Sequence, residues 1–439
     1  MSNEVHVIGA GLAGAEAAWQ ITRLGLKVVL HEMRPGKLTP AHKTGDFAEL
    51  VCSNSFKSKS RSNASGLLKE ELSRLGSLIM SCAVANELPA GQALAVDRDL
   101  FAKCVSDTLT SNPLVTVIEE EVTKLSHHPD EPWVIASGPL TSDALALALQ
   151  DILGESYLYF FDAIAPIVTA ESLDMSKVFR ASRYDKGDAD YLNCPMSKEQ
   201  YMTFLTELLA AECHPGHDFE KTSFFEGCIP IEEMAKRGAK TLAFGPLKPV
   251  GLKPPDSDLP PYAVVQLRQD NVSAELYNLV GFQTNLRYAE QDRVFRLIPG
   301  LEEAKFVRYG TMHRNLFINS PRLLEPSLRF KEFPLLFCAG QMTGVEGYLE
   351  SAATGWLAGQ NAARVALDRE VVTLPPTTVM GALLHYITHA AEDNFQPMNA
   401  IFGIMPPLNE SGKRLSKKER QEEYAGRSLS TLSEWMKKV

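Results

Sequence analysis

The sequence lacks the paired cysteines that disulfide-rich and metal-binding proteins use. Its seven cysteines, at positions 52, 82, 104, 194, 213, 228 and 338, are an odd number without any C-x-x-C spacing. This pattern argues against a disulfide framework, a zinc ribbon and a dithiol redox motif. We therefore expect free thiols, no metal site and a cytoplasmic location, where thiols stay reduced.

Long apolar runs and an excess of positive charge are also missing. No segment approaches the roughly 18 consecutive apolar residues that a membrane-spanning helix needs, so no membrane anchor is predicted. No charged n-region precedes an apolar h-region, so we expect no signal peptide. The net charge of −10 and the pI near 5.6 argue against a generic polyanion binder, but they leave room for a local basic patch that binds one structured nucleic acid.

The first 32 residues predict a dinucleotide-binding unit. An apolar run at 5–8 breaks at the glycine motif of residues 9–14, and a helical pattern follows and ends at Gly25. A second apolar run leads to Glu32, where a carboxylate can accept hydrogen bonds from a ribose. The glycines permit a tight turn and bring backbone N–H groups close to a pyrophosphate at the helix N-terminus. The expected cofactor contacts are Ile8, Gly9, Ala10, Gly11, Leu12, Ala13, Gly14 and Glu32.

Later segments predict that the chain leaves this unit and returns to it. Strands are expected at 115–121 and 133–136, and amphipathic helices at 67–80, 97–109 and 143–153. Basic residues and prolines crowd between about 157 and 314, which indicates an inserted domain. The buried run Leu335–Gly340 then precedes a helix at 349–367, which is rich in small residues suited to close packing on a sheet. The fold class is therefore α/β: a Rossmann-type FAD-binding domain in two parts, 1–180 and 315–439, with a smaller α/β domain inserted at 181–314.

The returning segment favours FAD over NAD as the resident cofactor. A strand that ends in Ala-Gly, followed by a loop and a helix, is how many flavoproteins aim a helix N-terminus at the flavin. Gly340, Gly344 and Val345 are the expected contacts there. No second G-x-G-x-x-G occurs, so NAD(P)H is not expected to have a Rossmann site of its own.

Eight strings together resemble one family, the folate- and FAD-dependent tRNA uracil-5-methyltransferases, over about residues 4 to 405. They are VIGAGLAGAEAAWQ, HEMRP, FAELVCSNSFKS, FFEGCIPIEEMA, KPVGL, GFQTNL, YGTMHRN and FCAGQMTGVEGYLESAATG. The resemblance implies methylation of a T-loop uridine in tRNA, with 5,10-methylenetetrahydrofolate as carbon donor, FAD as cofactor and NAD(P)H as reductant.

The resemblance also assigns roles to three residues. Cys228 matches the nucleophile that adds to C6 of uracil, and the cations and the helix that follow it would lower the pKa of its thiol. Cys52 matches a second functional cysteine near the flavin, which would act as a base or guard the methylene carrier. His313 matches the residue that stacks on the pterin. The other five cysteines are expected to be structural.

Three alternatives remain at this point. The same chemistry could act on a uridine of 23S ribosomal RNA, because a sister enzyme with that activity shares the fold and the motifs. A flavin thiol-disulfide oxidoreductase would need paired cysteines and a second nucleotide motif, and both are missing. A non-catalytic, FAD-bound RNA-binding protein would show flavin absorbance without methyl transfer. The sequence does not distinguish NADH from NADPH, and it does not define the oligomeric state.

Overall fold

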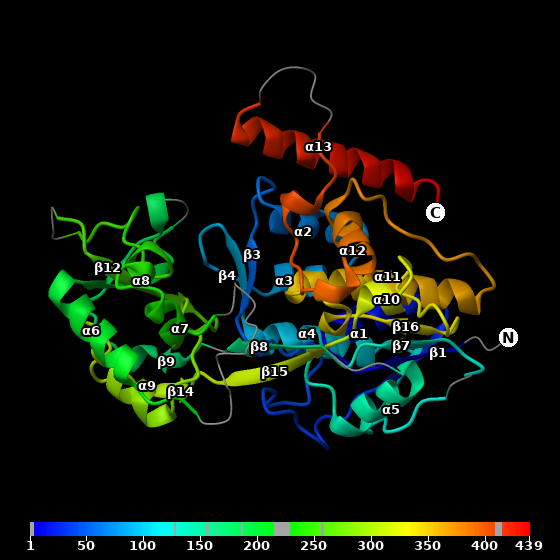
Figure 1. Ribbon diagram of the computed structural model, residues 1–439, viewed down its shortest axis with the longest axis horizontal. Coiled ribbons are helices and arrows are strands. Elements are labelled where there is room, and N and C mark those ends of the chain that lie inside the picture. Colours follow the sequence, from blue (N-terminus) through cyan, green and yellow to red (C-terminus); the bar gives the residue numbers. More distant parts are fainter. Residues whose placement is uncertain are drawn as a thin grey trace.

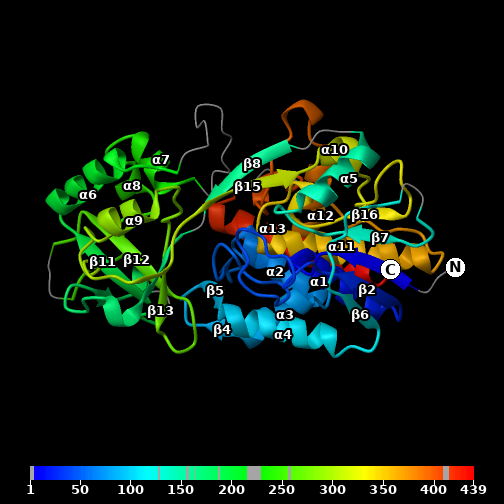
Figure 2. The same cartoon turned by 90° about the horizontal axis from the view of Figure 1, so that it is seen from below.

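A five-stranded parallel sheet forms the centre of the larger half of the molecule (Figures 1 and 2). The computed structural model describes residues 4–126, 129–154, 158–163, 165–185, 188–214, 229–255, 259–408 and 415–439. The strand order is β16 (Leu336–Cys338), β7 (Trp133–Ile135), β1 (Glu4–Ile8), β2 (Lys27–His31) and β6 (Val115–Ile118). The strand near residue 336 thus pairs with β7, next to the strand that opens the chain. This arrangement confirms the Rossmann-type α/β fold and the late return of the chain to its first sheet.

Two long helices cross in close contact beside this sheet. They are α1 (Leu12–Arg23) and α11 (Tyr348–Ala366). A Cβ atom added at Gly355 would lie 2.2 Å from the carbonyl oxygen of Ala13, and one added at Gly359 would lie 2.6 Å from that of Ala17. The small residues of α11 therefore allow close packing against α1 as well as against the sheet. Helix α5 (Asp143–Leu153) lies on the other side of the sheet from α11 (Figure 1).

A second group of elements extends the larger half. The helices are α2 (Ala64–Arg74), α3 (Leu78–Ala85), α4 (Arg98–Thr110), α10 (Ser320–Leu323), α12 (Val379–His389) and α13 (Lys417–Met436). A small antiparallel sheet joins β3 (Ser55–Ser58), β5 (Ala93–Val96) and β4 (Glu87–Leu88). The single helix predicted at 67–80 is wrong. The Ser77 hydroxyl accepts from the N–H of Met80 and donates to Glu16, which starts a new helix at that point.

The smaller half contains a six-stranded antiparallel sheet with its own apolar core. The strand order is β10 (Phe179–Arg180), β11 (Tyr191–Met196), β12 (Ala263–Gln269), β13 (Leu276–Leu279), β9 (Ile167–Thr169) and β14 (Phe306–Arg308). Its helices are α6 (Lys198–Ala210), α7 (Ile231–Lys236), α8 (Thr241–Phe244) and α9 (Tyr288–Phe295). The domain boundary expected after residue 180 falls between β10 and β11, which pair in this sheet. The sequence did not show this, because β9 and β10 are too short to give a clear pattern. The exact limits of the domains stay a prediction.

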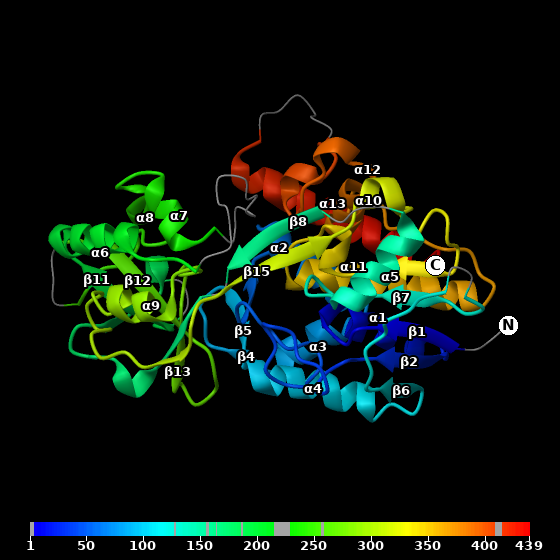
Figure 3. The ribbon, with the colours of Figure 1, turned by 60° about the horizontal axis from the view of Figure 1, so that its bottom comes forward.

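A two-stranded antiparallel ribbon connects the two halves (Figure 3). It consists of β8 (Leu158–Ala163) and β15 (Met312–Phe317), the segments on which the chain leaves the larger half and comes back. In the part of the chain that the structure describes, no helix has the length and apolar character needed to span a membrane.

Candidate functional site

A large pocket opens where the parallel strands of the first sheet end. Ligands of open α/β sheets bind at this carboxyl edge. The pocket is lined by the glycine turn after β1, by the segment after β2, by the turn after β7, and by the loop between β16 and α11. Residues from the long loop before β3 and from the smaller half complete it, namely Cys52, Ser53, Lys57, Arg268 and Gln283.

The glycine turn has the geometry that phosphate binding requires. A Cβ atom on Gly14 would lie 1.7 Å from the carbonyl oxygen of Gly9, so only glycine allows α1 to begin this close to the turn. Gly11 is the N-cap of α1, has no side-chain cap, and has no other group within 4 Å of the place where a Cβ would stand. The first N–H groups of α1 therefore face open space, which suits an anion. Ile8, Gly9, Gly11, Leu12 and Ala13 line the pocket, whereas Ala10 and Gly14 do not.

Glu32 lines the pocket but already accepts four hydrogen bonds. Its donors are the N–H of Ala10 at 2.8 Å and the N–H, Nε and Nη2 of Arg34, each at 3.0 Å. Burial would raise the pKa of Glu32, but the hydrogen bonds and the charge of Arg34 outweigh it and hold the pKa below its usual range. A carboxylate has about four lone-pair sites. The ribose role of Glu32 therefore stays a prediction, and a ribose bound there would have to displace a contact of Arg34.

A second uncapped helix N-terminus faces the same pocket. Helix α11 begins after Gly347, has no side-chain cap, and contributes Tyr348 and Ser351 to the lining. Gly340 lines the pocket as well, and its N–H donates to the hydroxyl of Thr354. Two of the expected contacts lie elsewhere: Gly344 packs against the ring of Phe395, and Val345 is fully buried in the core.

These features fit a dinucleotide of the FAD type. The start of α1 offers free backbone donors for a diphosphate, and the start of α11 places a second positive helix end in the same cavity. A flavin with an electron-rich pyrimidine edge matches that second helix end. Neither N-cap has a side chain that would compete for these donors, and the carboxylate of Glu350 in the first turn of α11 accepts from Lys57 and from the N–H of Ala400.

Cys52 lies at the side of the pocket where the two halves meet. Its backbone N–H and that of Ser53 both donate to the hydroxyl of Tyr348, at 2.9 and 3.0 Å. From the smaller half, Arg268 donates to the hydroxyl of Ser53 at 2.7 Å. Cys52 is only half-buried. Its loop is therefore ordered by contacts with both halves, and its side chain faces a cavity large enough for a reactant.

Most of the other described cysteines differ from Cys52 in their surroundings. Burial raises the pKa of the Cys338 thiol to about 12 and that of Cys213 to about 11. Cys194 is fully buried, and burial raises the pKa of its thiol far above the usual range. A thiol that stays protonated is a poor nucleophile, so these three environments suit structural cysteines.

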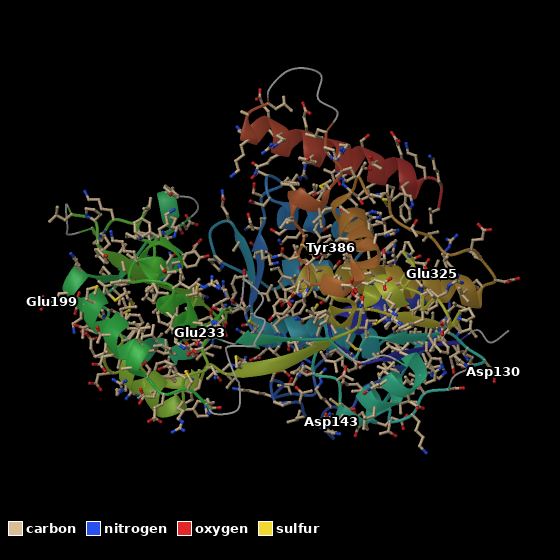
Figure 4. The ribbon with its side chains drawn as sticks, viewed as in Figure 1. Asp130, Asp143, Glu199, Glu233, Glu325 and Tyr386 are labelled. Carbon is tan, nitrogen blue, oxygen red and sulfur yellow. The ribbon has the colours of Figure 1, made fainter. Side chains whose placement is uncertain are left out.

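Cys228 lies outside the described residues, and so does the side chain of His313. The described chain resumes at Ile229, and the N–H of Ile231 donates to the carbonyl of Gln283, a residue that lines the pocket, at 2.7 Å. Helix α7 follows, and Figure 4 shows its Glu233 on the side of the smaller half that is turned toward the larger half. The backbone of His313 pairs with Asp162 in the β8–β15 ribbon, and Asn315 on the same strand lines the pocket.

Several pocket residues were not predicted from the sequence. Arg268, Gln283 and Asn315 come from segments far from the glycine motif, and no local pattern connects them with it. Tyr348 and Lys57 could have been predicted as site residues, because each lies in one of the strings that carry the family resemblance. A tyrosine directly after the glycine that starts a helix is placed to act at that helix end.

The fold and the pocket define a Rossmann-type dinucleotide-binding protein with a second, mainly antiparallel half. The family model "Glucose inhibited division protein A" (GIDA) matches residues 4–370. The structure of GidA from Aquifex aeolicus superposes with a TM-score of 0.72 at 17% identity, over 98% of this chain and 73% of that chain, which supports the fold.

Two curated relatives match almost the full length of the chain. Both are named methylenetetrahydrofolate–tRNA-(uracil-5-)-methyltransferase TrmFO. The protein from Desulforudis audaxviator is 59% identical over 437 residues, 99% of each chain. The protein from Anoxybacillus flavithermus is 56% identical over 99% of this chain and 100% of its own. The chain therefore belongs to the GIDA family and, within it, to the TrmFO methyltransferases.

Proposed function

We propose that this protein methylates C5 of a T-loop uridine in tRNA. Methylenetetrahydrofolate supplies the carbon, FAD is the resident cofactor and NAD(P)H is the reductant. The observation that carries this proposal is the meeting of three parts at one pocket: the glycine turn, the start of α11 and Cys52. The near full-length identity to TrmFO proteins supports the substrate and the donor. A cytoplasmic location is part of the proposal, because its substrates and its free thiols belong there.

The residues of the pocket divide the binding of FAD between two helix ends. Gly11, Leu12 and Ala13 would hold the diphosphate at the start of α1, and Gly340 and Gly347 would lie against the flavin at the start of α11. When bound, the flavin supplies a carrier for the one-carbon unit and a hydride for its reduction. The protein positions these groups and keeps water away from them.

The two cysteines would carry out the steps at the uracil ring. The thiolate of Cys228 adds to C6, so that C5 becomes nucleophilic and attacks the one-carbon unit. The C5 proton must then leave, and Cys52 at the pocket is the proposed base. Once a hydride has reduced the one-carbon unit to a methyl group, elimination of Cys228 from C6 restores the C5–C6 double bond and frees the enzyme. His313, on the ribbon that also brings Asn315 to the pocket, is proposed to stack on the pterin.

A basic surface of the smaller half supports an RNA substrate. The segment 236–253 has five cations and no acidic residue, in a chain with a net charge of −10. It follows Cys228 by one short helix, α7, and its cations Lys240, Lys248 and Lys253 are exposed. Phe244 in the same segment is 76% exposed, which would allow an unstacked base to lie on its ring. Phosphate contacts of this kind position an RNA without reading its sequence.

The test is to analyse nucleosides by mass spectrometry after incubation with methylenetetrahydrofolate and NAD(P)H. Unmodified tRNA should gain 5-methyluridine, and a fragment of 23S ribosomal RNA should not. Methylation of the ribosomal fragment alone would replace the proposed substrate. Flavin-containing protein that methylates neither RNA would support the non-catalytic alternative. Reactions without folate, run with the same protein, control for carbon from any other donor.

A further inference from the structure

Arg268 is a buried cation whose side-chain hydrogen-bond partners are neutral. It follows Leu267 on β12 of the smaller half, and its side chain enters the pocket beside Cys52. Its Nε donates to the amide oxygen of Asn54 at 2.8 Å, and its Nη2 donates to the hydroxyl of Ser53 at 2.7 Å. Only 8% of its surface is exposed. Buried arginines are usually compensated by an anion, and here neither partner carries a charge.

The carboxylate of Asp270, two residues after Arg268, is already used by a second arginine. Arg98 donates from Nε to both oxygens of Asp270, at 3.1 and 3.0 Å, and from Nη1 to the carbonyl of Leu50. Its Nη2 is buried and has no hydrogen-bond partner among the described residues. Asp270 is therefore paired with Arg98, and Arg268 has no ion pair of its own among the described residues.

After Tyr191 and Asp270, the thiol of Cys52 is a third group that raises the pKa of Arg268. It interacts electrostatically with Arg98, with Arg268 and with a third arginine, Arg308 of β14. Burial lowers the pKa of Arg268 and outweighs the three groups that raise it. A thiolate beside it would supply the missing negative charge.

We propose that Arg268 is a positioning residue that fixes the Cys52 loop through Ser53 and Asn54 and keeps the Cys52 thiol deprotonated. The inference rests on the role proposed above for Cys52, since a base must be unprotonated before it can accept a proton from C5. In the resting protein the proton of Cys52 is released to solvent, and the guanidinium stays charged throughout.

The other charged or titratable groups around Cys52 come from several elements. Arg98 has Asp97 and Asp99 beside it at the start of α4, and the carboxylate of Asp97 caps that helix and accepts from the N–H of Val272. Tyr348 of α11 binds the backbone of the Cys52 loop, and burial raises the pKa of its hydroxyl, so it stays a neutral partner. In the loop itself Glu49 is paired with Arg34, and on β3 Lys57 is paired with Glu350.

The test measures the reactivity of Cys52 without any RNA or folate. The FAD-loaded protein is alkylated with iodoacetamide between about pH 5 and about pH 10, and the Cys52 peptide is followed by mass spectrometry. Removal of an opposite charge within a few ångströms shifts a pKa by about one unit or more. Arg268→Gln should therefore raise the pKa of the Cys52 thiol by about one unit and slow its alkylation about tenfold at neutral pH. Arg268→Lys keeps the charge and should restore most of the rate.

For a second variant we expect the pKa of the Cys52 thiol to change in the opposite direction. Asp270→Asn removes the carboxylate that pairs with Arg98, so the positive potential at Cys52 grows and the thiol pKa should fall. A purely structural role of these residues would move both variants in the same direction. Arg183→Gln is the matched control: Arg183 also donates to neutral oxygens, of Gln266 and Val250, but its pKa reflects burial, Tyr184 and Tyr191.

Two results would overturn the inference. One is an unchanged alkylation profile of Cys52 in Arg268→Gln, and the other is an upward shift of its pKa in Asp270→Asn. Because Asp270→Asn tests the same charge balance, the inference stays testable if Arg268→Gln fails to fold. If the parent protein failed to methylate tRNA while Arg268→Gln and Asp270→Asn shifted the Cys52 profile as expected, the proposed function would be wrong and this inference would stand.

Discussion

Gly11 and Gly14 lie three residues apart, yet valine at one and alanine at the other should have opposite consequences. Gly11 has φ −70° and ψ −172°, a backbone conformation that any residue adopts, and nothing lies within 4 Å of its missing Cβ. Gly11→Val should therefore fold normally, with a change in the free energy of unfolding of the apoprotein within about 0.5 kcal/mol. Its isopropyl group would fill the space in front of the α1 N–H groups, and FAD binding should be lost.

Gly14→Ala should instead damage the fold. Its Cβ would stand 1.7 Å from the carbonyl oxygen of Gly9, about half of a normal contact distance, and the atom that must yield belongs to the backbone. Overpacking of this kind costs about 1 to 3 kcal/mol or more, because α1 must move away from the sheet. The sequence motif does not distinguish the two glycines, whereas the structure assigns Gly11 to the binding of FAD and Gly14 to the packing of α1.

The assay is the flavin absorbance per mole of purified protein, together with thermal melting of the FAD-free forms. Apoproteins must be compared, since bound FAD stabilises the folded state by mass action and would exaggerate the effect of Gly11→Val. Gly11→Val with a full flavin complement would refute the assignment of this turn to the diphosphate. Gly14→Ala that melts like the parent protein would refute the steric argument.

Three further changes test the site. With 5-fluorouridine at the target position of the RNA, the parent protein and Cys52→Ala should form a covalent adduct that survives a denaturing gel, and Cys228→Ala should not. An adduct in Cys228→Ala that is absent from Cys52→Ala would exchange the roles of the two cysteines. His313→Ala should keep FAD and weaken folate binding several-fold, for a lost stacking contact of about 1 kcal/mol, and an unchanged affinity in an equilibrium titration would remove His313 from the folate site. Burial lowers the pKa of Lys69 on α2 to about 7, although the charge of Glu350 opposes it. Between about pH 7 and the usual lysine pKa of about 10.4 the unfolded chain therefore binds one more proton than the folded protein, and the free energy of unfolding rises with pH. Lys69→Met should remove up to about 1.4 kcal/mol per pH unit of that rise, measured by urea unfolding; equal slopes in both proteins would show that Lys69 titrates normally.

The parts of the fold that repeat a local pattern could be predicted from the sequence. The glycine turn, the strands of the first sheet and the late return at β16 each have a hydrophobic period or a turn motif within about ten residues. The break between α2 and α3 was missed because apolar spacing continues across it. Helix α2 ends where Gly76, at φ +74°, takes the left-handed conformation and the N–H of Ser77 bonds back to the carbonyl of Leu72. The contact of Ser77 with Glu16, 61 residues away in the sequence, then holds the start of α3.

Site residues could be predicted only where a short stretch of sequence contains both the residue and the neighbours that shape its environment. Gly9 and Cys52 meet that condition. Gly344 and Val345 were placed with the cofactor by their position in a loop, and since both are buried and neither lines the pocket, their contact with the cofactor stays a prediction. Arg268 could not be found, because its importance comes from a tertiary contact with Ser53 across 215 residues.

The contacts between the two halves explain why Cys52 is sensitive to the smaller half. The apolar cores of the halves share no residue among those described, and polar contacts connect them instead. Asn54 donates to the carbonyl of Gln269 at 2.9 Å, Arg98 binds Asp270, and Tyr191 donates to the carbonyl of Ala90 at 3.2 Å. Polar contacts of this kind add little net stability but have strict geometry. Since two of them hold the residues that flank or face Cys52, a change in how the smaller half sits would alter the surroundings of the thiol before it lowers the stability of either half.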